Sequence, residues 1–115
     1  MKLIEQQAKP INKGSVPLSK KEIDGLMRQI PHWSLGEKTL GCEFRFKDFQ
    51  QAMDFANSVA AIANRENHHP DLFISYSRVQ ITLSTHAVDG LTLNDFIVAA
   101  KIDALRTDMF GKKAA

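Results

Sequence analysis

The sequence predicts an α+β fold of two layers, a four-stranded antiparallel sheet with three helices packed on one face. The periods of the apolar residues lead to this fold class. Segments with the apolar period of helices alternate with pairs of segments that have the two-residue period of strands. The expected order is helix, strand, strand, helix, strand, strand, helix. Consecutive short strands favour antiparallel pairing, which leaves the helices to cover one side of the sheet.

The first predicted helix begins after Ser19. Residues 19–22 match a capping box, in which a serine and a glutamate side chain satisfy free N–H groups of the first turn. Apolar residues then recur at the spacing of one helical face, and Pro31 ends the helix. The residues of that face are Ile23, Leu26, Met27 and Ile30.

Two strands are expected next. Trp33 and Leu35 indicate a short strand before a turn at Gly36. From Thr39 onward, apolar and polar residues alternate, which predicts a half-buried strand. Its inward side chains are Leu40, Cys42, Phe44 and Phe46.

The second helix is predicted to begin at Asp48, which can cap it, and to end before Pro70. An apolar stripe along one side defines the face that is expected to be buried. The stripe consists of Phe49, Met53, Ala56 and Ala60, widened by Phe55, Val59 and Ile62.

Residues 72–76 and 79–85 predict a β-hairpin with a tight turn. If the turn is centred between Ser77 and Arg78, His69 lies opposite His86. After the hairpin, residues 92–95 resemble another capping box that opens the last helix. The core candidates of that helix are Phe96, Ile97, Ala100, Ala104 and Leu105.

The length of 115 residues fits a single domain, because domains most often have roughly 100–150 residues. We expect this domain over residues 18–110, with a flexible N-terminal tail over 1–17 and a C-terminal tail over 111–115. A domain of this size buries only about 60–70% of the surface that its unfolded chain exposes. Association into a homo-oligomer is therefore expected.

Charge and composition exclude several classes of function. The net charge of +2 is too small and too dispersed for a nucleic-acid-binding surface. No apolar run approaches the ~18 residues of a membrane span, and the N-terminus lacks the apolar segment of a signal peptide. The single Cys42 excludes an intrachain disulfide and fits a reducing compartment. We expect a cytoplasmic protein that binds neither nucleic acid nor membrane.

The histidines indicate acid/base chemistry. Three of the four lie within nineteen residues, at positions 68, 69 and 86. The hairpin and the two adjacent helix ends should bring them to one end of the sheet, together with Asp95. Imidazole titrates near neutral pH, so a histidine can both donate and accept a proton there. A carboxylate such as Asp95 can orient one of these imidazoles.

Each of these residues also has a purely structural interpretation. The His-His-Pro tripeptide can be a helix-ending turn, Asp95 can serve only as part of a helix cap, and His86 can be a polar strand end. His32 is expected to be an exposed turn residue. A metal site is a further alternative, but no cysteine or second acidic residue completes a usual ligand set.

The joint pattern of His68-His69-Pro70, Tyr76, His86 and Asp95 resembles the signature of the pterin-4a-carbinolamine dehydratase family, also called 4a-hydroxytetrahydrobiopterin dehydratases. The similarity extends from residue 17 to about residue 105. It implies dehydration of a 4a-hydroxytetrahydropterin to quinonoid dihydropterin, which recycles the cofactor of aromatic amino acid hydroxylases.

The resemblance also implies roles for individual residues. His68, His69 and His86 would be the acid/base residues, with Asp95 assisting. The residues expected to contact the pterin are His68, His69, Pro70, Ser84, Thr85 and His86. No metal and no organic cofactor are implied. The implied assemblies are dimers that extend the sheet, and tetramers in which dimers pair through helices.

One position departs from the family pattern, which commonly has a charged residue four positions before the first histidine, where this chain has Asn64. An alternative function is a non-catalytic dimerisation or regulatory module, because animal members also act as dimerisation partners of a transcription factor. Fold does not decide between the two. The complete set of three histidines and Asp95 favours the enzyme.

Overall fold

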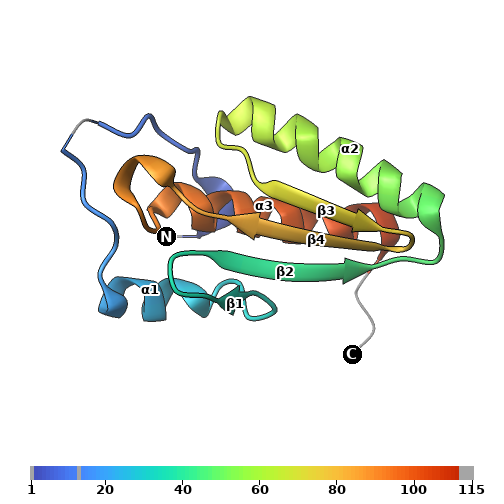
Figure 1. The fold of residues 1–115 in the computed structure, drawn as a ribbon, viewed down its shortest axis with the longest axis horizontal. Helices are drawn as coiled ribbons and strands as arrows, with labels where there is room; N and C mark the ends of the chain where they lie inside the picture. The colour runs from blue at the N-terminus through green and yellow to red at the C-terminus, as the bar shows by residue number, and fades with distance from the viewer. Residues whose placement is uncertain (1, 13, 112–115) are drawn as a thin grey trace.

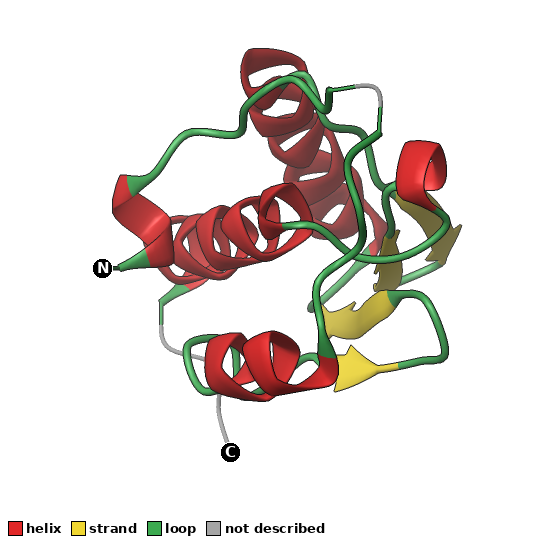
Figure 2. Cartoon of the chain, turned by 90° about the vertical axis from the view of Figure 1, so that its left-hand side faces the viewer, coloured by secondary structure: helices red, strands yellow, loops and turns green. Residues whose placement is uncertain are grey.

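The computed structural model describes residues 2–12 and 14–111, and it confirms the predicted fold class. The elements within these ranges are α1 (Lys20–Met27), β1 (Ser34–Leu35), β2 (Leu40–Arg45), α2 (Phe49–Glu66), β3 (Asp71–Ser75), β4 (Arg78–Leu83) and α3 (Leu93–Phe110). Two 3-10 helices accompany them, η1 (Leu3–Glu5) and η2 (His86–Val88). The three α-helices lie on one side of the sheet (Figures 1 and 2).

The sheet is antiparallel, with the strand order β1-β2-β4-β3. The central strands β2 and β4 pair over their full length, from Leu40 with Leu83 to Arg45 with Arg78. Every second residue of β2 and β4 is buried up to the end of the pairing, which confirms the predicted alternation. The longer edge of the sheet is β3, which pairs only with β4.

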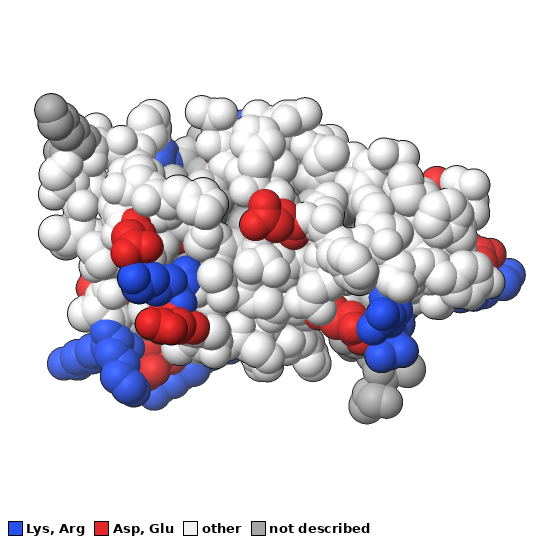
Figure 3. Space-filling view, in the orientation of Figure 1, with Lys and Arg blue, Asp and Glu red and all other residues white. Residues whose placement is uncertain are grey.

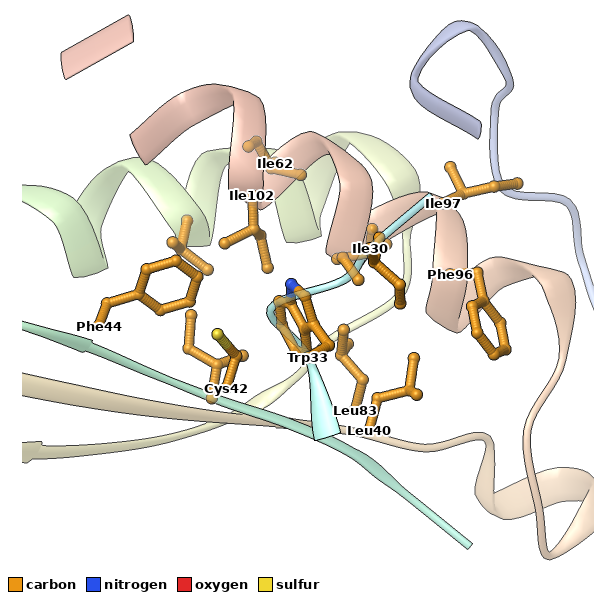
Figure 4. Packing of buried hydrophobic residues seen from close by; sticks show 14 of the residues in the cluster. Ile30, Trp33, Leu40, Cys42, Phe44, Ile62, Leu83, Phe96, Ile97 and Ile102 are labelled. Atoms are coloured by element: carbon orange, nitrogen blue, oxygen red, sulfur yellow. The ribbon is translucent and has the colours of Figure 1, made fainter. Parts of the chain in front are cut away.

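The core fills the space between the inner face of the sheet and helices α2 and α3 (Figure 4). Phe44 lies between Trp33 and Phe55, with ring centroids 6.1 Å and 5.1 Å away. The indole N–H of Trp33 donates a hydrogen bond to Asp103 Oδ1 at 2.9 Å. This bond ties the segment after α1 to α3.

Helix α2 begins at its predicted cap, where the Asp48 side chain accepts a hydrogen bond from the Gln51 N–H at 2.9 Å. Its buried face is rotated from the predicted one, because Phe49 and Ala60 are exposed. The stripe centred on Phe55 and Val59 carries more apolar volume than a stripe through Met53 and Ala60, so it takes the position against the sheet. The buried apolar residues of α2 are Ala52, Phe55, Ala56, Val59, Ile62 and Ala63.

The structure differs from the expected flexible N-terminal tail. Leu3 is fully buried, and its N–H donates to Gln29 Oε1 at 2.8 Å. Further along, backbone groups of Ala8 and Lys9 bond to side chains of α2 and α3. We call residues 2–12 the N-terminal strap, which runs across one end of the helical layer (Figures 1 and 2). The expected C-terminal tail lies outside the described residues apart from Gly111.

Figure 3 shows the side of the molecule on which the sheet lies uncovered. Most of this surface is formed by uncharged residues; acidic and basic side chains lie together toward its two ends, and an acidic group stands alone near the middle. In the part of the chain that the structure describes, no helix combines the length and the apolar character needed to cross a membrane.

Candidate active site

The elements that carry the predicted site residues meet at one end of the sheet. Helix α2 ends there, β3 begins, β4 ends in η2, and α3 begins (Figure 1). The end of α2 sets the position of the first histidine. Asn67 adopts the left-handed conformation, with φ of 51°, and the His68 N–H then donates to the Ala63 carbonyl oxygen at 3.1 Å. This helix-ending geometry turns His68 back toward α3.

His68 and Asp95 form a buried pair. The Nε2 atom of His68 lies 2.6 Å from Asp95 Oδ1, and the two side chains are 11% and 0% exposed. An ionised carboxylate can only accept a hydrogen bond, so the neutral imidazole carries its proton on Nε2. The Nδ1 atom of the neutral His68 then carries no proton.

Two threonines fix Asp95 from its other side. Asp95 Oδ2 accepts hydrogen bonds from Thr85 Oγ1 at 2.7 Å and from the Thr92 backbone N–H at 3.0 Å. Because Thr85 gives its proton to Asp95, the Thr92 hydroxyl is the donor in the 2.8 Å contact between the two threonines. These bonds offset the cost of burying a carboxylate and hold it in one orientation. Asp95 therefore serves both in the predicted cap of α3 and as the partner of His68.

The second histidine, His69, has a different hydrogen-bond partner from His68. His69 is exposed, and its Nε2 atom lies 3.0 Å from Asn64 Oδ1 on the last turn of α2. The amide oxygen accepts, so the neutral His69 also carries its proton on Nε2. The position that departs from the family pattern thus still supplies a hydrogen-bond acceptor to a site histidine. Pro70, the next predicted contact, is half-buried where the chain enters β3.

His86 does not lie opposite His69, and the predicted hairpin register is wrong. Asp71 pairs with Thr82 rather than with Ser84, and the turn is formed by Tyr76 and Ser77. Tyr76 adopts the left-handed conformation, with φ of 50°, which moves the turn earlier in the chain. His86 lies past the end of β4, exposed, as the first residue of η2.

A recess of about 200 Å³ lies beside His86. Its lining is formed by Lys38, Thr39, Ser84, Thr85, His86, Asp89 and Gly90. The Lys38 Nζ atom lies 2.7 Å from Asp89 Oδ2 at this recess. The hydrogen bond and charge of Lys38 lower the pKa of Asp89, and those of Asp89 raise the pKa of Lys38. His68, His69 and Pro70 do not line this recess.

The contacts change the role that Thr85 can have. The hydroxyl of this predicted substrate contact is engaged by Thr92 and Asp95, so it positions the carboxylate. Thr92 was not predicted as a site residue, although its place in the capping box with Asp95 indicated the proximity. Over residues 2–12 and 14–111, no cluster of three or more His, Cys, Asp or Glu side chains is arranged to hold a metal ion.

Comparisons with known proteins agree on one family. Residues 16–105 match the sequence model of the family described as pterin 4 alpha carbinolamine dehydratase. A protein of Nitrosospira multiformis named as a pterin-4-alpha-carbinolamine dehydratase is 48% identical over 103 residues, which are 90% of this chain and 91% of that protein. A protein of Rubrobacter xylanophilus with the same name is 43% identical and aligns over 90% of this chain and 97% of its own length.

A solved structure gives the same relationship. The crystal structure of a transcriptional coactivator/pterin dehydratase from Brucella melitensis superimposes with a TM-score of 0.74. The two chains are 33% identical, and the superposition covers 77% of this chain and 97% of the Brucella chain. The similarity in fold therefore extends over 77% of this chain.

Proposed function

This chain belongs to the pterin 4 alpha carbinolamine dehydratase family, and we propose that it is a hydro-lyase that converts a 4a-hydroxytetrahydropterin into quinonoid dihydropterin and water. The observation that carries the proposal is the buried pair of His68 and Asp95. Asp95 holds one imidazole in a defined orientation at the end of the sheet to which His69 and His86 also belong.

The dehydration requires two proton transfers. One proton is added to the 4a-hydroxyl group so that it leaves as water when the carbon–oxygen bond breaks. A second proton is removed from a ring nitrogen, whose electron pair forms the new double bond. The enzyme gains one proton and loses one, so a pair of imidazoles in opposite protonation states can perform both transfers and exchange roles with solvent.

The hydrogen bonds suggest how the residues share this work. His68 presents Nδ1 to a bound pterin while Asp95 stabilises the imidazolium that forms when Nδ1 accepts a proton. His69, supported by Asn64, and His86, at its recess, are the other acid/base residues of the proposal. Ser84 and Pro70 contribute substrate contacts, and Thr85 acts through Asp95.

We also propose a metabolic role, a cellular location and an oligomeric state for the protein. The reaction recycles the pterin cofactor of aromatic amino acid hydroxylases, and it needs neither a metal nor an organic cofactor. The protein acts as a cytoplasmic homo-oligomer. The exposed Leu72 and Phe73 on edge strand β3 support association through this edge, because unpaired backbone groups there can bond to a second copy.

The alternative is a non-catalytic regulatory module. It is favoured by the Brucella protein, which is described as both a transcriptional coactivator and a pterin dehydratase. A protein that only presents a binding surface has no need for a buried carboxylate that two donors hold on one side and that contacts a histidine on the other.

A direct assay separates the two functions. The substrate is 4a-hydroxytetrahydropterin generated immediately before use, and formation of the quinonoid product is followed by absorbance against the spontaneous rate. We expect the wild-type protein to accelerate the reaction, and Asp95→Asn to lose about 10²-fold or more of that acceleration. If the wild-type rate equals the spontaneous rate, the regulatory function becomes the better explanation.

A further inference from the structure

The N-terminal strap is bonded to a residue close to each member of the His68–Asp95 pair. The Ala8 N–H donates to Glu66 Oε1 at 2.8 Å, and Glu66 lies two residues before His68. Lys9 exchanges two hydrogen bonds with Asn94, which directly precedes Asp95. Its N–H donates to Asn94 Oδ1 at 3.0 Å, and its carbonyl oxygen accepts from Asn94 Nδ2 at 2.7 Å.

From this arrangement we infer that Glu66 and Asn94 are positioning residues, which clamp the end of α2 to the start of α3 through the N-terminal strap and so hold His68 against Asp95. The inference rests on the proposed function only where it concerns turnover. The clamp itself concerns the position of the His68 side chain, which can be measured whether or not the protein is active.

Glu66 is the centre of the clamp. Its side chain is 4% exposed, and its second oxygen accepts a hydrogen bond from Lys101 Nζ on α3 at 2.9 Å. Burial acts to raise the pKa of Glu66, but the bonds from Ala8 and Lys101 and the charges of Lys101 and Arg65 hold it below the ordinary value. One carboxylate therefore joins α2 to both the strap and α3.

Asn94 completes the clamp from the other helix. The paired bonds between its side-chain amide and the Lys9 backbone reproduce the pattern of two residues in neighbouring strands. Asn94 is buried at the first turn of α3, so its orientation is coupled to that of Asp95. At its far end the strap is anchored independently by the fully buried Leu3.

The length of the contact explains why such a clamp matters. His68 and Asp95 come from the ends of two helices, and the hydrogen bond between them is 2.6 Å long. A relative shift of about 1 Å would break it, and misplacement of this size can reduce turnover by about 10²-fold. A strap that only added stability would leave the histidine geometry unchanged when its bonds to Glu66 and Asn94 are removed.

The test uses the full-length chain in four forms beside the wild type. Asn94→Ala and the double variant Glu66→Ala/Asn94→Ala remove the clamp. Glu66→Gln keeps an oxygen that can accept from Ala8, and so keeps the bond to the strap, but it loses the acceptor for Lys101. Trp33→Phe is the matched control, because it removes a different long-range hydrogen bond to α3, the one to Asp103. The readouts are the tautomer of His68 in long-range proton–nitrogen NMR spectra of ¹⁵N-histidine protein, kcat and KM for dehydration, and unfolding in urea.

We expect the wild type, Glu66→Gln and Trp33→Phe to show His68 as the single tautomer protonated on Nε2. Both alanine variants should show a mixture of tautomers, with kcat lower by about 10- to 100-fold and KM changed only a few-fold. The inference is overturned if folded Asn94→Ala keeps the single tautomer and a kcat within twofold of wild type. It is also overturned if Trp33→Phe loses as much kcat at equal stability. An inactive wild type would remove the proposed function, while the tautomer of His68 would still test the clamp.

Discussion

Adjacent histidines at the end of α2 have different environments. His68 is nearly buried against Asp95, whereas His69 is exposed beside Asn64. The two rings bond to different helices, because His68 Nε2 contacts Asp95 at the start of α3 and His69 Nε2 contacts Asn64 near the end of α2. One imidazole is thus held by a carboxylate, and the other remains accessible to a substrate and to solvent.

Asn64 gives a prediction about the effect of a single residue. Replacing Asn64 with Glu keeps an oxygen that can accept from His69 Nε2 and adds a charge that favours the imidazolium. We expect kcat to change only a few-fold, because the acceptor that orients the ring is already present. Steady-state dehydration rates of the two proteins measure this. A hundredfold gain in kcat would show that Asn64 severely limits the activity of the natural protein.

The sequence predicts which residues are candidates for the site, but it does not predict most of their contacts. The pattern of histidines and Asp95 is visible in the sequence because its spacing is specific. The engagement of Thr85 by Asp95 and Thr92 depends on side-chain directions at a helix start and a strand end, which no period of the sequence contains. The Thr85 hydroxyl bonds to Asp95 and Thr92, and the contact of Thr85 with substrate stays a prediction.

Among the elements, the β3–β4 hairpin is the one whose turn position the sequence pattern did not predict correctly. The alternation on β4 predicted the strand and its inward face, but not the turn. Tyrosine rarely adopts a left-handed backbone, so Tyr76 gives no turn signal in the sequence, and the pattern instead predicts a turn centred between Ser77 and Arg78. A shift of turn position changes every cross-strand partner, which is why the expected pairing of His69 with His86 was wrong.

The same turn gives a stability prediction. Tyr76 is 68% exposed, so its side chain contributes little packing within one chain. Asparagine tolerates the left-handed conformation better, and Tyr76→Asn should raise the free energy of unfolding by up to about 1 kcal/mol. Urea denaturation at equal protein concentration measures the difference. A loss of more than about 1 kcal/mol would mean that the tyrosine ring packs against something outside its own chain.

The carboxylate that joins α2, α3 and the strap predicts a pH dependence. The pKa of Glu66 is lowered in the folded protein, so its ionised form contributes stability above the ordinary glutamate value of 4.5 and loses it as the pH falls through the lower folded value. Glu66→Gln cannot titrate. The stability difference between wild type and this variant should therefore be largest near neutral pH and should narrow below pH 4.5. If the difference in the free energy of unfolding between the two proteins stays constant between pH 7 and pH 3, the ionised Glu66 side chain does not stabilise the fold in this way.

For the whole molecule, the periodic segments predicted the two layers and the order of elements, because burial of apolar faces decides both. The N-terminal strap was missed for a physical reason. Apart from the buried Leu3 side chain, its contacts are hydrogen bonds between its backbone and side chains more than twenty residues away. The sequence of the strap gives no periodic pattern that would indicate such bonds.

At the scale of the whole molecule, we predict that copies of the chain associate into an oligomer. Phe73 on edge strand β3 is 64% exposed and Leu35 on the opposite, two-residue edge strand is 47% exposed. We expect light scattering to find an oligomer at micromolar concentration. Phe73→Lys should shift it toward the monomer, because it places a charge at the longer edge, and Leu35→Lys should not. A wild-type monomer across this range would contradict the proposal.

The central claim is that histidines at one end of the sheet carry out acid/base catalysis of pterin dehydration. It is tested most directly by the dehydration rate of the double variant His69→Ala/His86→Ala beside His32→Ala, whose histidine is exposed and distant in the sequence from the site. Loss of one positioned acid/base group typically costs about 10²–10⁴-fold in rate. The account predicts a loss of at least this size for the folded double variant and a near wild-type rate for His32→Ala. A folded double variant that retains more than about a tenth of the wild-type rate would contradict it.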